Sequence, residues 1–113
     1  MRLLVLAAAL GAAVPAVALA AAPAPSVQRG HEVFDRWCAP CHAPGPGHPG
    51  TQSLEAKYKG SKPGALEQRT DLTTELTRFY VRTGVSIMPF FRKTEVSDAD
   101  LAALGAYIAR PRP

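Results

Sequence analysis

The sequence predicts a small all-α domain of three to four helices joined by long loops. Three stretches, within residues 27–38, 73–84 and 97–111, repeat apolar residues at the spacing of an amphipathic helix. No stretch alternates apolar and polar residues over the length of a strand. Residues 43–50 contain three prolines and three glycines, which indicates an irregular segment. Because a bare helix bundle needs shorter loops, we expect something other than side chains to fill the space between the helices.

The first residues predict an export signal. Residues 1–20, "MRLLVLAAALGAAVPAVALA", place one basic residue before an apolar run, and residues 18–20 supply the small side chains that signal peptidase requires. We therefore predict a signal peptide over 1–20, a flexible Pro/Ala-rich segment over 21–25 and one domain over 26–113. The apolar run is too short and wrongly flanked for a stable anchor, so no membrane span is expected after cleavage.

Charge and cysteine content narrow the classes of function. Loss of Arg2 with the signal peptide would leave twelve basic residues against nine acidic ones, a net charge of +3. The basic residues are dispersed, so the chain has no block of like charge that would indicate a nucleic-acid partner. The two cysteines, Cys38 and Cys41, are too close together to close a structural disulfide loop. The pair is therefore expected to be catalytic, metal-binding or linked to a cofactor.

The first predicted helix, residues 27–38, ends at the cysteine pair. Ser26 is a typical N-cap, and most charged residues fall away from the apolar face. The helix therefore buries one face and carries the first cysteine at its end. The residues near that apolar face are Val27, Gly30, Val33, Phe34 and Trp37.

The segment "RWCAPCH", residues 36–42, fits two kinds of chemistry. Trp37 followed by Cys-Ala-Pro-Cys has the form of a thioredoxin dithiol, whereas Cys38-x-x-Cys41-His42 is the attachment signal for a c-type haem. Cysteines three positions apart lie about one helical turn apart, so their sulfurs can add to the two vinyl groups on one porphyrin edge. His42 would then be the proximal iron ligand. Haem attachment follows export, which agrees with the predicted signal peptide.

The thioredoxin alternative, with Cys38 and Cys41 as an exchanging dithiol, lacks its strands. "GVSIMPFF", residues 84–91, does resemble the Met-Pro loop that faces the dithiol in thioredoxins. However, that motif needs a buried strand before it, and a buried strand is nearly continuously apolar. Residues 29–36, "RGHEVFDR", are charged and follow a helical period, and "FFRKTEVSD" leads directly into a helix. The sequence therefore favours haem attachment.

A second main helix is predicted over residues 73–84. Thr73 can cap its start, and Gly84 can end it in a left-handed cap. A weaker pattern near residues 52–60 predicts a short additional helix. The predicted apolar stripe of the main helix consists of Leu72, Leu76, Phe79 and Tyr80.

Met88 is the candidate for the sixth iron ligand. It is the one methionine of the mature chain, 46 residues after His42, in a loop bounded by glycine and proline. A thioether opposite histidine raises the reduction potential and closes the iron to substrate. The alternatives are that Met88 fills the core or that the sixth site is open. His48 lies too near His42 to reach the opposite haem face, and His31 lies on the first helix.

The last predicted helix lies within residues 97–111. Ser97 with Asp100 forms a capping box, and Pro111 stops the helix. Its apolar stripe consists of Leu101, Leu104 and Ile108.

Together these segments resemble a small class I c-type cytochrome over essentially the whole mature chain. The likeness rests on the start that runs from Gly30 and Phe34 through Cys38-x-x-Cys41-His42, on the Met88-Pro89 loop, and on the last helix, Leu101 to Ile108. The resemblance implies a cytochrome c-like fold wrapped around one haem c, held covalently through two thioethers. It also implies that the first and last helices cross closely, with Gly30 facing Tyr107, because glycine has no side chain to hold them apart.

The sequence departs from this family after the haem motif. "PGPGHPGT" stands where a Gly-Pro-x-Leu segment is usual. A carbonyl near a proline there is expected to accept the hydrogen bond from His42 Nδ1, and Pro46 and Pro49 are both candidates. Tyr58, Lys57 and Arg69 suit haem propionates by residue type only.

The resemblance implies a periplasmic electron carrier rather than an enzyme, with His42 and Met88 as axial ligands. Residues 82–91, "RTGVSIMPFF", and the last helix also resemble the cytochrome subunits of 4-cresol dehydrogenase-type flavocytochromes. That likeness implies a flavoprotein dehydrogenase as electron donor. A free carrier that feeds a terminal oxidase or another cytochrome of the respiratory chain is the alternative. A haem protein with an open sixth site is a further one.

Overall fold

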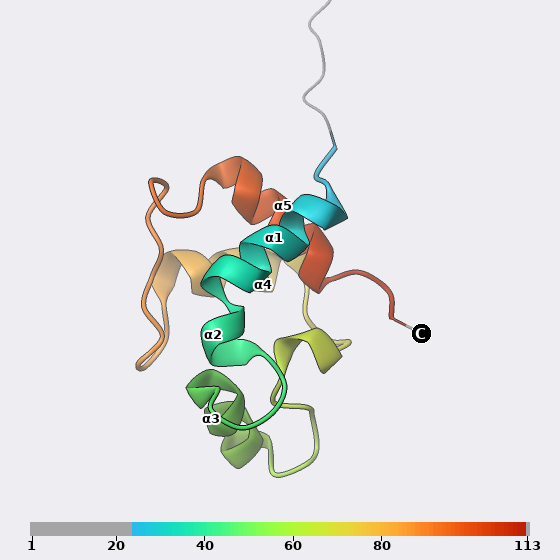
Figure 1. The fold of residues 1–113 in the computed structure, drawn as a ribbon, viewed down its shortest axis with the longest axis vertical. Coiled ribbons are helices and arrows are strands. Elements are labelled where there is room, and N and C mark those ends of the chain that lie inside the picture. Colours follow the sequence, from blue (N-terminus) through green and yellow to red (C-terminus); the bar gives the residue numbers. More distant parts are fainter. Residues whose placement is uncertain (1–23, 113) are drawn as a thin grey trace, which may run out of the picture.

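The computed structural model describes residues 24–112, and these form an all-α domain (Figure 1). The predicted fold class is confirmed. No β-strand occurs in these residues, and one isolated antiparallel bridge joins Val85 to Met88. The predicted signal peptide lies outside the described residues, as does most of the predicted flexible segment. The elements are α1 (Val27–Trp37), α2 (Ala39–His42), α3 (Pro49–Tyr58), the 3₁₀ turn η1 (Leu66–Gln68), α4 (Thr74–Thr83) and α5 (Asp98–Ile108).

The five α-helices of the described chain exceed the predicted three to four. The difference arises after the first helix, which ends at Trp37 instead of continuing through Cys38. Cys38 has φ −111° and ψ −43°, and the chain then starts the four-residue helix α2. The weakly predicted helix near 52–60 is α3, which begins earlier, at Pro49. No helix in residues 24–112 is long and apolar enough to cross a membrane.

The close crossing of α1 and α5 organises the domain (Figure 1). Gly30 is buried where the two helices meet. A Cβ added there would overlap the carbonyl oxygen of Ala103 and would lie 2.6 Å from Tyr107 Cβ. The predicted contact between Gly30 and Tyr107 is therefore confirmed. Glycine is needed here for the close approach of two helices, which outweighs its poor helix propensity.

Gly30→Ala is therefore expected to destabilise the domain by roughly 1–3 kcal/mol, since the overlap with backbone atoms of α5 outweighs the better helix propensity of alanine. Urea denaturation measures the free energy of unfolding. Gln28→Ala, at an exposed position of the same helix, is the control and is expected to change it little. Equal stability of the Gly30→Ala variant and wild type would contradict the close crossing.

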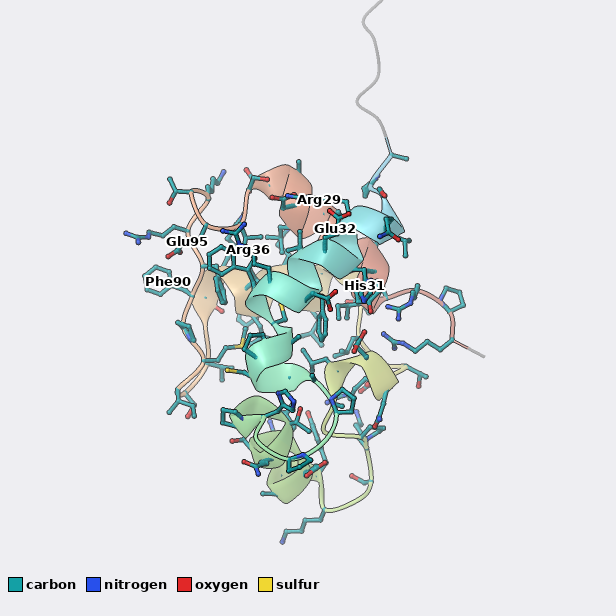
Figure 2. The ribbon with its side chains drawn as sticks, viewed as in Figure 1. Arg29, His31, Glu32, Arg36, Phe90 and Glu95 are labelled. Atoms are coloured by element: carbon teal, nitrogen blue, oxygen red, sulfur yellow. The ribbon has the colours of Figure 1, made fainter. Side chains whose placement is uncertain are left out.

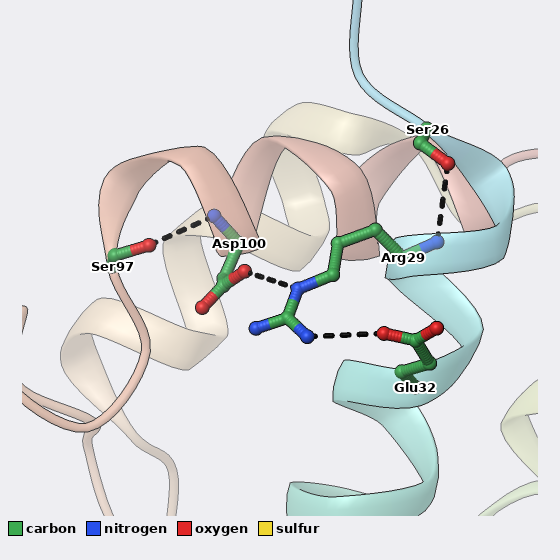
Figure 3. Close-up of polar contacts among 5 residues, drawn as sticks. All are labelled: Ser26, Arg29, Glu32, Ser97 and Asp100. Carbon is green, nitrogen blue, oxygen red and sulfur yellow. Dashed lines mark hydrogen bonds and ion pairs between the residues drawn. The ribbon is translucent and has the colours of Figure 1, made fainter.

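An ion-pair network links the first turns of α1 and α5 (Figure 3). Arg29 Nε donates to Asp100 Oδ1 at 2.8 Å, and its Nη1 donates to Glu32 Oε2 at 3.0 Å. The predicted N-caps are confirmed, because Ser26 Oγ accepts from the Arg29 amide and Ser97 Oγ from the Asp100 amide. Only the Ser97 half of the predicted capping box forms, because the Asp100 carboxylate pairs with Arg29. That guanidinium lowers the pKa of Asp100.

The core lies between α1, α4 and α5. Phe34 and Leu104 are among its most completely buried side chains. The Tyr107 ring lies 5.7 Å from the Phe34 ring, and Trp37 and Cys38 pack against the edge of the core. The apolar faces predicted for the first and last helices therefore do meet, except at Val27, which is 45% exposed. The buried core cluster consists of Val33, Phe34, Val81, Val96, Leu101, Leu104, Tyr107 and Ile108.

Of the stripe predicted for α4, Leu72 packs against the core, but the rest is wrong as a core face. The buried apolar residue of α4 is Val81, whereas Phe79 is 57% exposed and Leu76 and Tyr80 are each over a third exposed. The reason is tertiary: α5 covers α4 where Gly105 meets Thr74, and the described chain leaves much of the remaining apolar surface of α4 open. Among the described residues, six of the seven exposed large apolar side chains lie between positions 76 and 90. They are Leu76, Phe79, Tyr80, Val85, Ile87 and Phe90.

Gly84 ends α4, as predicted, but in a different conformation. Its φ of 68° favours glycine, and its ψ of 174° lies outside the predicted left-handed region. An added Cβ would lie 2.7 Å from the Met88 carbonyl oxygen. The chain therefore turns sharply at Gly84 into the loop that carries Met88.

Candidate haem site

The three residues of the predicted attachment motif lie on one short helical segment. The Cys38 amide donates to the Phe34 carbonyl at 2.8 Å, so the first cysteine closes the last turn of α1. The Cys41 and His42 amides both donate to the Cys38 carbonyl, at 3.1 and 2.8 Å. The motif therefore starts at the end of a helix packed in the core and is held by its own backbone hydrogen bonds. This arrangement presents both sulfurs and the imidazole from one turn of chain.

The two thiols have different surroundings. Cys38 is half-buried against the core, Cys41 is exposed, and both are free. Burial, with a smaller contribution from Cys41, raises the pKa of the Cys38 thiol to about 12. A disulfide exchanger needs a thiolate at neutral pH, which requires a lowered pKa. Together with the absence of strands in residues 24–112, this thiol environment argues against the thioredoxin alternative.

The His42 imidazole is suited to metal ligation. Burial lowers its pKa, which favours the neutral ring that binds metals. Its Nδ1 atom is buried and has no hydrogen-bond partner among the described residues. The predicted acceptor, a carbonyl near Pro46 or Pro49, is therefore wrong for this structure. The Pro49 carbonyl instead begins α3 and accepts from the Ser53 hydroxyl at 2.8 Å.

The Gly/Pro-rich loop after His42 is fastened at both ends. Thr51 is 1% exposed, and its hydroxyl donates to the Ala43 carbonyl at 2.8 Å. His48 Nδ1 lies 3.1 Å from the Pro40 carbonyl oxygen, and because a carbonyl only accepts, this nitrogen carries the proton. The loop therefore folds back on the haem motif. Sequence reasoning missed Thr51, since a single threonine after a Gly/Pro-rich stretch carries no distinctive pattern.

The two histidines considered as rival ligands have other contacts. His48 is engaged with Pro40, as described above. His31 projects from α1 (Figure 2), where its ring lies 5.0 Å from the Tyr107 ring and its Nε2 lies 3.5 Å from an Asp35 carboxylate oxygen. Both imidazole rings therefore already have contacts other than iron.

Met88 lies on a separate loop that is anchored to α4. It exchanges backbone hydrogen bonds with Val85 at 2.9 and 3.1 Å, which closes a tight turn. The Phe91 amide donates to the Val81 carbonyl at 2.8 Å, and Arg82 donates to the Phe91 carbonyl at 3.0 Å. Met88 itself is half-buried. No hydrogen bond among the described residues joins this loop to the Cys38–His42 turn.

Among the candidate propionate partners, Arg69 is buried and forms an ion pair with the exposed Asp71. Arg69 is 4% exposed, and its Nε and Nη2 donate to the two Asp71 oxygens at 2.7 Å each. Its guanidinium also lies 4.7 Å from the centre of the Tyr58 ring, and Lys57 stands 5.5 Å from the same ring. Lys62 completes the group with a 2.6 Å bond to Asp71. The partner of Arg69 in this structure is therefore Asp71, which sequence reasoning did not single out.

The stability of this group is expected to depend on pH. Bonds from Arg69 and Lys62 hold the pKa of Asp71 below its ordinary value of 3.8. A lowered pKa stabilises the fold above the unfolded-state value, and this contribution is lost as the pH falls below it. Asp71→Asn is expected to cost roughly 1–2 kcal/mol at pH 7, because the buried Arg69 loses its charge partner while the exposure of Asp71 screens the pair.

Urea denaturation between pH 3 and pH 7 measures this effect. The difference between wild type and the Asp71→Asn variant should be constant above about pH 5 and shrink below about pH 4. Glu75→Gln, at an exposed position of α4, is the control. A difference that does not change with pH would contradict the ion-pair interpretation.

A comparison with protein families identifies the domain. The family model described as "Cytochrome C oxidase, cbb3-type, subunit III" matches residues 25–108, which is most of the chain. Comparisons with curated proteins and with solved structures found no match. The match includes the Cys38–His42 turn, the Met88 loop and both crossing helices. The chain therefore belongs to this cytochrome c family, and it is a class I c-type cytochrome, a haem-based electron-transfer protein.

Proposed function

We propose that this chain is an exported electron carrier that holds one haem c through thioethers to Cys38 and Cys41, with His42 and Met88 as axial ligands. The observation that carries the proposal is the presentation of both cysteines and His42 on one helical turn. Haem iron supplies one-electron chemistry, and ligation by histidine and methionine leaves it no open site for a substrate.

The residues of the motif have separate roles in this proposal. The two thiols bind the porphyrin edge covalently, so they fix the group to the end of α1 and need no disulfide chemistry. His42 offers a neutral ring nitrogen because burial lowers its pKa. Met88 offers a thioether from a loop that is held in two ways. Its backbone is hydrogen-bonded to Val85, and the Phe91 amide is hydrogen-bonded to the Val81 carbonyl of α4.

The exposed apolar residues at positions 76–90 support the proposal that a large apolar group covers part of this surface in the haem-loaded protein. An isolated domain seldom leaves so many large side chains in contact with water along one segment. Leu76 and Tyr80 on α4, and Val85 in the following turn, are suited to exclude water from a bound haem. A drier and more apolar setting favours the less charged, reduced state and so raises the potential.

The Met88 loop also carries features that suit docking of a redox partner. Ile87 is 80% exposed, and Phe90 points outward from the loop (Figure 2). Arg92 and Lys93 follow on the same segment and are exposed, and they form ion pairs with Glu95 and Asp98. An apolar tip with nearby basic residues fits a small, transient interface with an acidic rim, where charge mainly speeds encounter.

The proposed location is the periplasm, supported by the signal-like residues 1–20. The proposed donor is a flavoprotein dehydrogenase of the 4-cresol dehydrogenase type, from which this chain removes electrons one at a time. That choice rests on the likeness of residues 82–91. Delivery of electrons to an oxidase or another cytochrome of the respiratory chain completes the proposal.

Absorbance spectra test the proposed function directly. The full chain is expressed with periplasmic haem-attachment machinery, and spectra are recorded oxidised, reduced and as the pyridine haemochrome. We expect a two-thioether haemochrome and the weak long-wavelength ferric band of methionine ligation. Covalent haem without that band, combined with carbon monoxide binding, would mean an open sixth site. Free or disulfide-bonded thiols and no haem would overturn the proposal.

A further inference from the structure

The orientation of the His42 ring lacks its usual support. A metal-ligating histidine normally donates its other ring N–H to a carbonyl or carboxylate, which fixes the ring. Here Nδ1 is buried, and no described residue bonds to it. A buried ring without that hydrogen bond needs another contact to hold its rotation.

Gly50 provides such a contact. A Cβ added at Gly50 would lie 2.5 Å from His42 Cε1, 2.7 Å from His42 Nδ1 and 2.7 Å from the Cys41 carbonyl oxygen. Real Cβ atoms essentially never come so close to a neighbour, so the ring edge is packed directly against the Gly50 backbone. Gly50 is not among the glycines with positive φ. Its lack of a side chain therefore serves the close approach to the ring and not an unusual backbone conformation.

The backbone of Gly50 is itself held in place. It lies in the first turn of α3, which begins at Pro49. The next residue, Thr51, is 1% exposed and bonds the Ala43 carbonyl at 2.8 Å, directly after His42 in the chain. His48 adds a second tie, to Pro40 within the haem motif. The start of α3 is therefore fastened on both sides of the ring that it touches.

We propose that Gly50 is a positioning residue that sets the rotation of the His42 ring by steric contact, in place of a hydrogen bond from Nδ1, with Thr51 as its tether. This inference rests on the proposed function, because it concerns His42 as an iron ligand. The rotation of an axial imidazole about its bond to iron determines how unpaired spin is distributed over the porphyrin. Ring orientation is therefore measurable separately from electron-transfer activity.

Two matched glycine variants of the haem-loaded full chain test the inference. Gly50→Ala crowds the His42 ring. Gly105→Ala crowds the contact between α5 and α4 instead, because its Cβ would lie 2.7 Å from Thr74 Cγ2. Proton NMR of the ferric protein gives the spread of the haem methyl shifts, and a redox titration gives the midpoint potential. We expect Gly50→Ala to change both, and Gly105→Ala to lower the melting temperature while leaving both near wild type.

A direct measurement covers the case in which Gly50→Ala does not accumulate. In the reduced wild-type protein, nuclear Overhauser effects are expected between the Gly50 Hα protons and the His42 ring protons. Their absence would overturn the inference, as would wild-type methyl shifts in Gly50→Ala or equal changes in Gly105→Ala. A haem-bearing wild type with any of these results leaves the proposed function intact. A wild type without covalent haem would overturn both.

Discussion

Cys41→Ser is expected to abolish most covalent haem retention, because a serine hydroxyl does not add to the vinyl group that the thiol would bind. One of the two attachment points is removed and Cys38 remains, so any haem that is still covalently bound should be held through one thioether only. Cys41 is exposed, whereas Cys38 is half-buried against the core. Replacement of Cys41 therefore changes the chemistry of the site with little cost to packing, which makes it the cleaner of the two cysteine variants.

The yield of holoprotein is measured by the pyridine haemochrome and by intact mass, which detects the added haem. Pro40→Ala is the matched control, because it lies between the two cysteines, is exposed and keeps the Cys-x-x-Cys-His spacing. That variant should mature normally. A wild-type yield of two-thioether haemochrome from Cys41→Ser would refute the proposed attachment and return the cysteine pair to another role.

Met88→Ala is expected to lower the reduction potential by roughly 0.1–0.3 V, part of the range that axial ligands span in haem proteins. A thioether stabilises ferrous iron, so its loss favours the ferric state. The variant should also bind carbon monoxide and cyanide, because the sixth position is then open. Redox titration and ligand-binding spectra measure both effects.

Ile87→Ala provides the control for this experiment. Ile87 is the neighbour of Met88 in the same tight turn and is 80% exposed, so its truncation tests the loop without removing a sulfur. We expect its potential and ligand binding to stay near wild type. If Met88→Ala behaved like Ile87→Ala, Met88 would be a packing residue and the sixth ligand would have to be sought elsewhere.

The helices and their caps were largely predictable from sequence. Ser26 and Thr73 cap α1 and α4 as predicted, because a cap depends on a side chain and an amide three residues away. The exposed stripe of α4 was not predictable in the same way. Leu76 and Phe79 have the spacing of a core face, but periodicity alone does not state which neighbour covers that face. In this structure Val81 is buried in the core cluster with residues of α1 and α5, whereas Leu76, Phe79 and Tyr80 are exposed.

The candidate site was likewise predictable from sequence only in part. The spacing of Cys38, Cys41 and His42 lies within one helical turn, so the sequence alone determined that two thiols and an imidazole would be presented together. The tertiary structure decided the partners that come from distant positions. Gly50 against the His42 ring and Asp71 beside the buried Arg69 are such cases. Local spacing follows from helix geometry, whereas these contacts depend on how the loops pack, and a short sequence pattern does not encode that packing.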